Sequence, residues 1–155
     1  LNKLIIMATT TASLSIESSD LVGDALSLST TKELYKAGTT VGLEETTGMA
    51  YIHLTATTSL DIFPVLPASP AGQNKQSWVY ICNKATDETH YITVTIAATE
   101  IGRLYANDFL FMPWSQIAQH ADIEIAPSTE AAAAGINVEY TCLHEGLTLP
   151  TSADS

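Results

Sequence analysis

Basic residues are scarce in this chain of 155 residues. Six lysines and arginines stand against 17 aspartates and glutamates, which gives a formal net charge of −11 at pH 7. A surface with this excess of negative charge repels phosphate backbones and complements a basic patch on another protein. We therefore expect a protein partner and no nucleic acid.

Cysteines and long apolar runs are also few. Cys82 and Cys142 are too few for a disulfide framework, and we expect two buried thiols, with a single bridge between neighbouring strands as the alternative. The apolar run after Lys3 is shorter than a secretory signal requires, and a translation start at Met7 would also explain the first six residues. No run has the length of a membrane span, so we expect no membrane.

Motifs that carry chemistry are missing as well. The sequence contains no Gly-x-Ser-x-Gly, His-Glu-x-x-His, Cys-x-x-Cys or glycine-rich phosphate loop. The histidines are scattered, and the acidic stretches 20–24, 44–45 and 87–88 lack the spacing of a calcium loop, so we interpret them as solvated turns. We predict no catalytic residue, no metal ligand and no cofactor, and hence no enzyme.

What the sequence does contain is a series of short strands. Apolar and polar residues alternate over 12–17 and 25–31, which is typical of half-buried strands. Residues 48–57 form a further strand, with Ile52 and Leu54 on one face and Tyr51 and His53 on the other. The runs 77–83 and 91–96 are rich in aromatic and β-branched residues and are joined by a polar segment, so we predict a β-hairpin.

Strands continue to the end of the domain. Asn107 and Asp108 indicate a turn before the apolar run 109–112, and 122–125 and 136–143 alternate again. Helical turns are expected only over 32–37, where Thr30 and Glu33 fit a capping box, and over 115–121. The segment 128–135 is too short for an independently stable helix, and we interpret it as a loop.

These patterns predict an all-β fold. We expect an antiparallel β-sandwich, jelly-roll-like or Ig-like, of about eight strands with one or two short helical turns. The predicted organisation is a flexible segment over 1–12, one sandwich domain over 13–149 and a frayed end over 150–155.

Two segments are candidates for binding a partner. The first is the apolar edge strand and loop over 60–72, from which we select Leu60, Ile62, Phe63, Pro64, Val65, Leu66, Pro67 and Pro70. If exposed, it would add to a neighbour's sheet; alternatively it closes its own core. The second is the Thr/Ser-rich stretch 8–29, which either extends as an arm onto a neighbouring subunit or packs against its own domain as the first strands.

The second half of the chain also resembles a known family. A Trp/Tyr-rich strand over 78–83 and a Thr/Val strand over 91–96 precede the segments LYANDFLFMPW, DIEIA and INVEYTCLHE. This order resembles the small β-sandwich structural proteins of tailed bacteriophages, in which an F-x-F-x-P strand and a closing V-E-Y strand recur. The resemblance covers about residues 76–145 and lies in strand order, not in a unique motif.

The resemblance implies a non-enzymatic virion protein, most specifically a capsid decoration or cement protein. Its partners would be the major capsid protein or another virion protein, it would self-associate as a dimer or trimer, and it would be located in the virion after assembly in the host cytoplasm. The alternative is a receptor- or carbohydrate-binding β-sandwich module of a tail or cell surface. Trp114, Tyr105 and Tyr51 exposed together on one face would favour sugar binding, and the same rings buried would favour a structural role.

Overall fold

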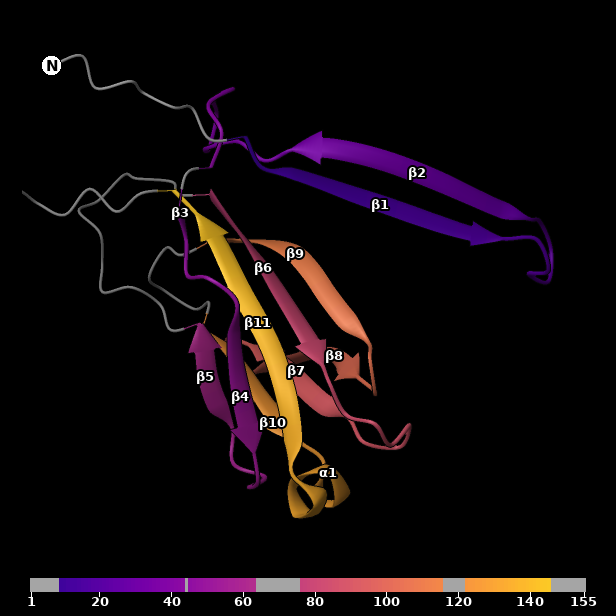
Figure 1. Ribbon diagram of the computed structural model, residues 1–155, viewed down its shortest axis with the longest axis vertical. Helices are drawn as coiled ribbons and strands as arrows, with labels where there is room; N and C mark the ends of the chain where they lie inside the picture. The colour runs from indigo at the N-terminus through magenta and orange to yellow at the C-terminus, as the bar shows by residue number, and fades with distance from the viewer. Residues whose placement is uncertain (1–8, 44, 64–75, 116–121, 146–155) are drawn as a thin grey trace, which may run out of the picture.

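The structure, a computed structural model, describes residues 9–43, 45–63, 76–115 and 122–145. Within these ranges the chain forms eleven strands and one short helix, and every strand pairing is antiparallel (Figure 1). The prediction of an all-β, sandwich-like fold is confirmed, with more strands than the eight expected.

Two sheets make up the body of the molecule. The four-stranded sheet has the order β5 (Leu60–Phe63), β10 (Ile123–Pro127), β7 (Ile92–Ile96) and β8 (Thr99–Leu104). The five-stranded sheet has the order β3 (Glu45–Thr46), β11 (Ile136–His144), β6 (Gln76–Asn83) and β9 (Phe109–Ser115), and β4 (Ala50–Leu54) also pairs with β11.

The core lies between the two sheets. Each strand alternates, so that one set of side chains points inward, and the inward aliphatic residues are almost fully buried. The central members are Val79, Ile81 and Val138 from the five-stranded sheet and Ile92, Val94, Ile123 and Ile125 from the four-stranded sheet. Phe63 packs against Trp114 and Tyr140 at ring-centroid distances of 5.8 and 5.6 Å and extends this core.

The hairpin predicted from 77–83 and 91–96 is wrong. Both segments are strands, but β6 pairs with β11 and β9, whereas β7 pairs with β8 and β10. The connection after Asn83 therefore crosses from one sheet to the other. A sequence pattern identifies strands, but it does not distinguish a hairpin from a crossing when the connection is eight residues long.

The helical predictions also need correction. Lys32 and Glu33 belong to β2 (Leu26–Glu33), not to a helical turn, and residues 116–121 lie outside the described residues. The predicted loop 128–135 contains α1 (Thr129–Ala134), in which the Ser128 hydroxyl accepts a hydrogen bond from the Ala131 N–H and Gly135 ends the helix at φ +75°. Burial of Ala131 against the sandwich supplies the stability that a six-residue helix lacks by itself.

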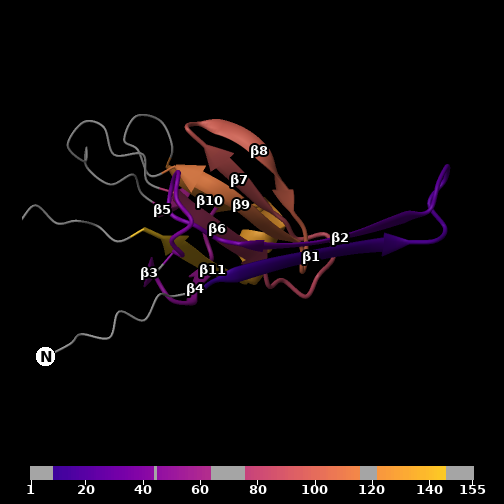
Figure 2. The ribbon, with the colours of Figure 1, turned by 90° about the horizontal axis from the view of Figure 1, so that it is seen from above.

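The first two strands do not join the sandwich. β1 (Thr11–Ser18) pairs along its whole length with β2, and this two-stranded sheet projects beyond the body in both views (Figures 1 and 2). We call residues 11–33 the arm. The two strands were predicted correctly, but the expectation that they are half-buried is wrong, because nearly every residue of both strands is exposed.

Candidate interaction surfaces: an arm and an aromatic patch

The arm is fastened firmly at its base. The Leu34 N–H donates to the Thr10 carbonyl oxygen at 2.8 Å, so the chain enters and leaves the arm at adjacent positions. The Leu43 N–H donates to the Leu34 carbonyl oxygen at 2.9 Å, and both leucine side chains are fully buried. The Ala37 N–H donates to the buried carboxylate of Glu145, which ties the base to the end of β11. The arm therefore leaves the body from a fixed point.

One face of the arm is apolar and open. Because Ile16 pairs with Leu28 and Ser18 with Leu26, the aliphatic side chains of both strands lie on the same face, together with Leu14. These four side chains, Leu14, Ile16, Leu26 and Leu28, have exposed fractions of 41–43%. We call them the apolar face of the arm. The acidic strand residues Glu17 and Glu33 lie on the opposite, Ser/Thr-rich face.

A second apolar surface lies on the outside of the five-stranded sheet. Trp78 and Tyr80 of β6 point outward beside Phe111 and Phe109 of the edge strand β9. Trp78 stacks on Phe111 at a ring-centroid distance of 5.0 Å, and Tyr80 lies 6.3 Å from Phe109. Phe109 is 59% exposed and Phe111 is 38% exposed. We call these four residues the aromatic patch.

Charge is sparse around the aromatic patch. Glu139 is the one acidic strand residue on this face among the described residues, and its carboxylate lies 3.7 Å from the Lys84 ammonium group. Burial among the neighbouring side chains raises the pKa of Tyr80 to about 12, so its phenol is neutral at physiological pH. The patch thus offers rings with few charged groups among them, which is typical of surfaces that bind apolar partners.

The structure describes only the first part, residues 60–63, of the segment 60–72 that was selected from the sequence. Leu60 is partly exposed at the start of β5, an edge strand as predicted, but Ile62 and Phe63 are buried in the core. Pro64, Val65, Leu66, Pro67 and Pro70 lie outside the described residues. Of the selected residues that the structure describes, only Leu60 is available at the surface.

The three rings that would have favoured sugar binding do not lie together. Trp114 is buried in the core against Phe63. Tyr105 follows β8 and packs 5.2 Å from Tyr91, whereas Tyr51 is 68% exposed on β4 of the other sheet. The aromatic patch, by contrast, was not selected from the sequence, although Trp78/Tyr80 and Phe109/Phe111 show the spacing of two that places side chains on one face.

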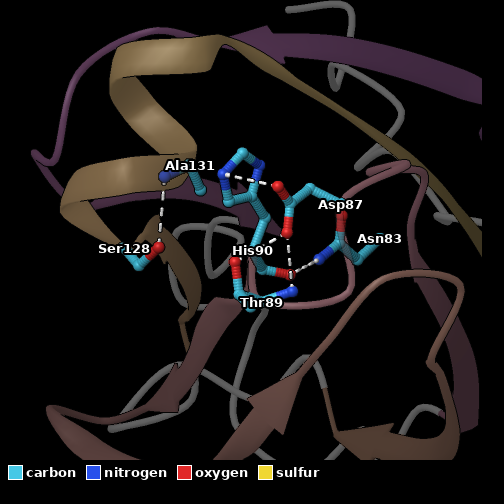
Figure 3. Close-up of polar contacts among 6 residues, drawn as sticks. All are labelled: Asn83, Asp87, Thr89, His90, Ser128 and Ala131. Carbon is cyan, nitrogen blue, oxygen red and sulfur yellow. Dashed lines mark hydrogen bonds and ion pairs between the residues drawn. The ribbon is translucent and has the colours of Figure 1, made fainter.

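Polar side chains gather where β6 crosses to β7 (Figure 3). The buried Asn83 amide donates to the carbonyl oxygens of His90 and Leu104 at 3.1 and 2.9 Å, and its oxygen accepts from the Ala85 N–H at 2.9 Å. Asn83 therefore links the crossing segment to the end of β8. With its donors and its acceptor all used, this amide is a structural group and not a binding site.

The acidic turn beside Asn83 also forms its hydrogen bonds within the turn itself. The Asp87 carboxylate accepts hydrogen bonds from the Thr89 hydroxyl and N–H, at 2.6 and 2.9 Å, and these bonds lower the pKa of Asp87 (Figure 3). The His90 ring lies 3.9 Å from the same carboxylate. Among the described residues, no three His, Cys, Asp or Glu side chains are grouped closely enough to hold a metal ion.

The cysteines are two buried thiols that form no disulfide, as predicted. Cys82 is paired with Glu139 and Cys142 with Val79, so the two residues are three positions apart in register and on opposite faces of the sheet. This geometry is incompatible with a bridge between them. The described histidines contact other groups: His53 hydrogen-bonds to Asn137, and His144 lies 3.5 Å from Glu45.

Comparison of the chain with protein-family models, curated proteins and solved structures gave no match. In the part of the chain that the structure describes, no helix is long and apolar enough to span a membrane.

Proposed function

We propose that this chain is a non-enzymatic structural protein of a tailed-bacteriophage virion, most specifically a capsid decoration or cement protein that binds the shell and self-associates. The observation that carries the proposal is the arm: a β-hairpin with an apolar face that the described remainder of the chain leaves exposed. The major capsid protein, or another virion protein, is the proposed partner.

Exposure of the apolar face has a free-energy cost that a partner removes. Burial of apolar surface contributes about 25 cal/mol per Å² removed from water, and four clustered aliphatic side chains form a continuous target. The projecting hairpin also offers the outer edges of β1 and β2, which no other described strand pairs with and along which another strand can pair. Both properties favour binding to a protein surface over binding to a small molecule.

The net charge of this chain and the repeated surface of a capsid both fit the role of a decoration protein. A protein with a net charge of −11 stays soluble before assembly and is attracted to basic patches on a lattice. Because a shell repeats its surface many times, a self-associated decoration protein attaches at several points, and weak individual contacts suffice.

The second candidate is a receptor- or carbohydrate-binding module of a tail or cell surface. The exposed rings of Phe109 and Tyr51 on one sheet face favour it. Strong and specific binding on a glycan array, lost in the Phe109→Ser variant and retained in the arm-deletion variant described below, would replace the capsid proposal with this one.

The capsid proposal is tested by removing the arm. Since Thr10 and Leu34 are hydrogen-bonded neighbours, residues 11–33 can be replaced by the turn dipeptide Asn-Gly with little strain on the body. The full chain is expected to co-sediment with particles purified from the encoding phage, and the arm-deletion variant to remain in the supernatant with an unchanged near-UV circular dichroism spectrum of its core aromatics.

The test has one control variant and two outcomes that would contradict the proposal. Ser15→Thr with Ser29→Thr changes a directly opposed pair on the polar face of the arm, and it should leave co-sedimentation unchanged. Attachment of the arm-deletion variant at the level of the full chain would show that the arm is not the attachment element. Mass spectrometry that fails to find the chain in purified particles would overturn the virion assignment itself.

A further inference from the structure

The arm and the aromatic patch are complementary in several respects. Both are apolar surfaces on antiparallel sheets, and face-to-face packing of two sheets is a common way to bury such surfaces. The apolar face of the arm presents four aliphatic side chains, and the patch presents four rings with few charges among them. Aliphatic side chains pack well against aromatic rings of a facing sheet.

The few charged groups on the two surfaces do not repel each other, and on the patch side Glu139 is already paired with Lys84. Lys32 is the one charged strand residue on the apolar side of the arm, where it pairs with Ala12, and Glu139 is the one acidic strand residue on the patch side of the sheet. The acidic residues Glu17 and Glu33 point away from the apolar face. Two copies with a net charge of −11 each can therefore meet through these surfaces without opposing their carboxylates.

The length of the arm suits contact with another molecule. Each of its strands has eight residues, which at about 3.3 Å per residue span about 26 Å, close to the width of a small domain. β1 and β2 pair with each other and with no other described strand, and the arm extends beyond the body in both views (Figures 1 and 2). An arm of this length reaches across the sheet of a neighbouring copy.

The buried surface area indicates whether a stable dimer needs one arm-to-patch contact or two. The apolar face exposes on the order of 300 Å², the size of a large patch on a monomer, so one arm on one aromatic patch buries on the order of 600 Å² in total. Stable interfaces bury about 1,200–2,000 Å². Reciprocal exchange, in which each copy gives its arm and receives the other, reaches the lower end of this range.

We infer that two copies of this chain form a twofold-symmetric dimer by reciprocal arm exchange, with the apolar face of each arm seated on the aromatic patch of the other copy. The inference depends on the proposed role of the arm in assembly and specifies the surface that receives it. A twofold axis makes the two contacts identical, so both unpartnered surfaces of each copy are covered at once.

The inference is tested by sedimentation velocity of the full chain over a range of concentrations. Ile16→Ser with Leu28→Ser alters the arm, and Phe109→Ser with Phe111→Ser alters the patch. Each pair should raise the dimer dissociation constant by at least about tenfold, the effect typical of losing interface anchors. Ser15→Thr with Ser29→Thr, and Tyr51→Ser on the same sheet face, are matched controls that should leave the dissociation constant unchanged.

A mixing experiment then identifies the acceptor. The arm variant keeps an intact patch and the patch variant keeps an intact arm, so an equimolar mixture restores one of the two contacts. A heterodimer that is tighter than either variant homodimer supports arm-to-patch exchange. A patch variant that dimerises as well as the wild type would overturn the inference in favour of contact between arms.

The outcome also separates this inference from the proposed function. A chain that stays monomeric at its solubility limit, yet needs its arm to co-sediment with particles, would overturn dimerisation by exchange and leave the capsid proposal standing. A dimer that follows the pattern above but does not attach to particles would support arm exchange and overturn the capsid proposal. Near-UV circular dichroism of every variant shows whether the sandwich remains folded.

Discussion

Ile16 lies directly opposite Leu28 in the arm, with exposed fractions of 41% and 43%. Ile125 lies directly opposite Val94 in the four-stranded sheet, and both are completely or almost completely buried. The two pairs are alike in sequence, since each consists of aliphatic residues that alternate with polar ones. They differ only in whether a second sheet covers them, and this difference makes the arm a candidate for binding a partner.

The contrast leads to a stability prediction. Ile125→Ala should lower the free energy of unfolding by about 2–5 kcal/mol, because it removes buried methylene groups and leaves a cavity. Ile16→Ala should lower it by less than about 1 kcal/mol, since this side chain contributes one exposed cross-strand pair. Urea unfolding below the concentration at which the chain associates measures both. Equal losses for the two variants would show that the arm is covered by its own body.

The strands themselves were largely predictable from sequence, and their partners were not. Alternation and β-branched or aromatic content located β1, β2, β4, β6, β7, β10 and β11. They also placed Tyr51 and His53 together on the face opposite Ile52 and Leu54, and this face is the exposed one in the structure. Alternation is a local property of one strand, whereas pairing depends on which sheets close over each other. For this reason 77–83 and 91–96 were assigned to one hairpin although they lie in different sheets.

One real hairpin was missed because its turn residues are atypical. β7 and β8 are joined by Ala97 and Ala98, whose φ values are +49° and +61°, and Ile96 pairs with Thr99. Two-residue turns with positive φ at both positions usually contain Asn and Gly, and alanine gives no such signal.

The same turn offers a stabilising substitution. An L-residue with a Cβ atom pays about 1–2 kcal/mol in the left-handed region, so Ala98→Gly with Ala97→Asn should raise the free energy of unfolding by about 1 kcal/mol or more. Ala56→Gly, in an exposed turn without positive φ, is the matched control and should be neutral or slightly destabilising. A loss of stability in the double variant would contradict the turn geometry.

The candidate surfaces were predictable only in outline. Composition indicated that the Thr/Ser-rich N-terminal stretch either extends as an arm or packs against its own domain as strands. The structure shows a projecting hairpin. For Ile62 and Phe63 the structure shows the alternative, in which this strand closes its own core: both side chains are buried, and Phe63 packs against Trp114. Whether an apolar strand residue binds a partner or its own core depends on tertiary burial, which its sequence does not contain.

Asn83 is expected to be the polar residue on which the crossing between the sheets depends. Asn83→Ala removes two donors and one acceptor from a fully buried position, and the free energy of unfolding should fall by about 2–4 kcal/mol. Lys84→Ala is the adjacent control: it breaks a partly exposed ion pair with Glu139 and should cost less than Asn83→Ala, about 1 kcal/mol. Chemical denaturation of the three proteins at neutral pH checks this order, and similar values for both variants would contradict it.

Asp61 gives the chain a stability that depends on pH. It lies directly opposite Glu124 across β5 and β10, and its pKa is raised above the ordinary value, first by reduced hydration and then by the Glu124 carboxylate. A raised pKa in the folded state means that Asp61 binds its proton more tightly in the folded protein than in the unfolded chain. The resulting stabilisation is fully present below the ordinary aspartate pKa and is lost as the pH rises through the raised value.

Asp61→Asn removes this charge, so the variant should be more stable than the wild type at pH 7. The difference should shrink as the pH falls through the raised pKa of Asp61 and should nearly vanish below its ordinary value, where both proteins are uncharged at this position. Glu124→Gln should give a gain of the same sign at pH 7, reduced by the changed hydrogen bond from the Ser59 hydroxyl. Urea unfolding at a series of pH values measures the trend. An Asp61→Asn variant that is less stable than the wild type at pH 7, with the gap closing toward acid pH, would mean that the Asp61 carboxylate is stabilised in the fold, contrary to its position opposite a second acid.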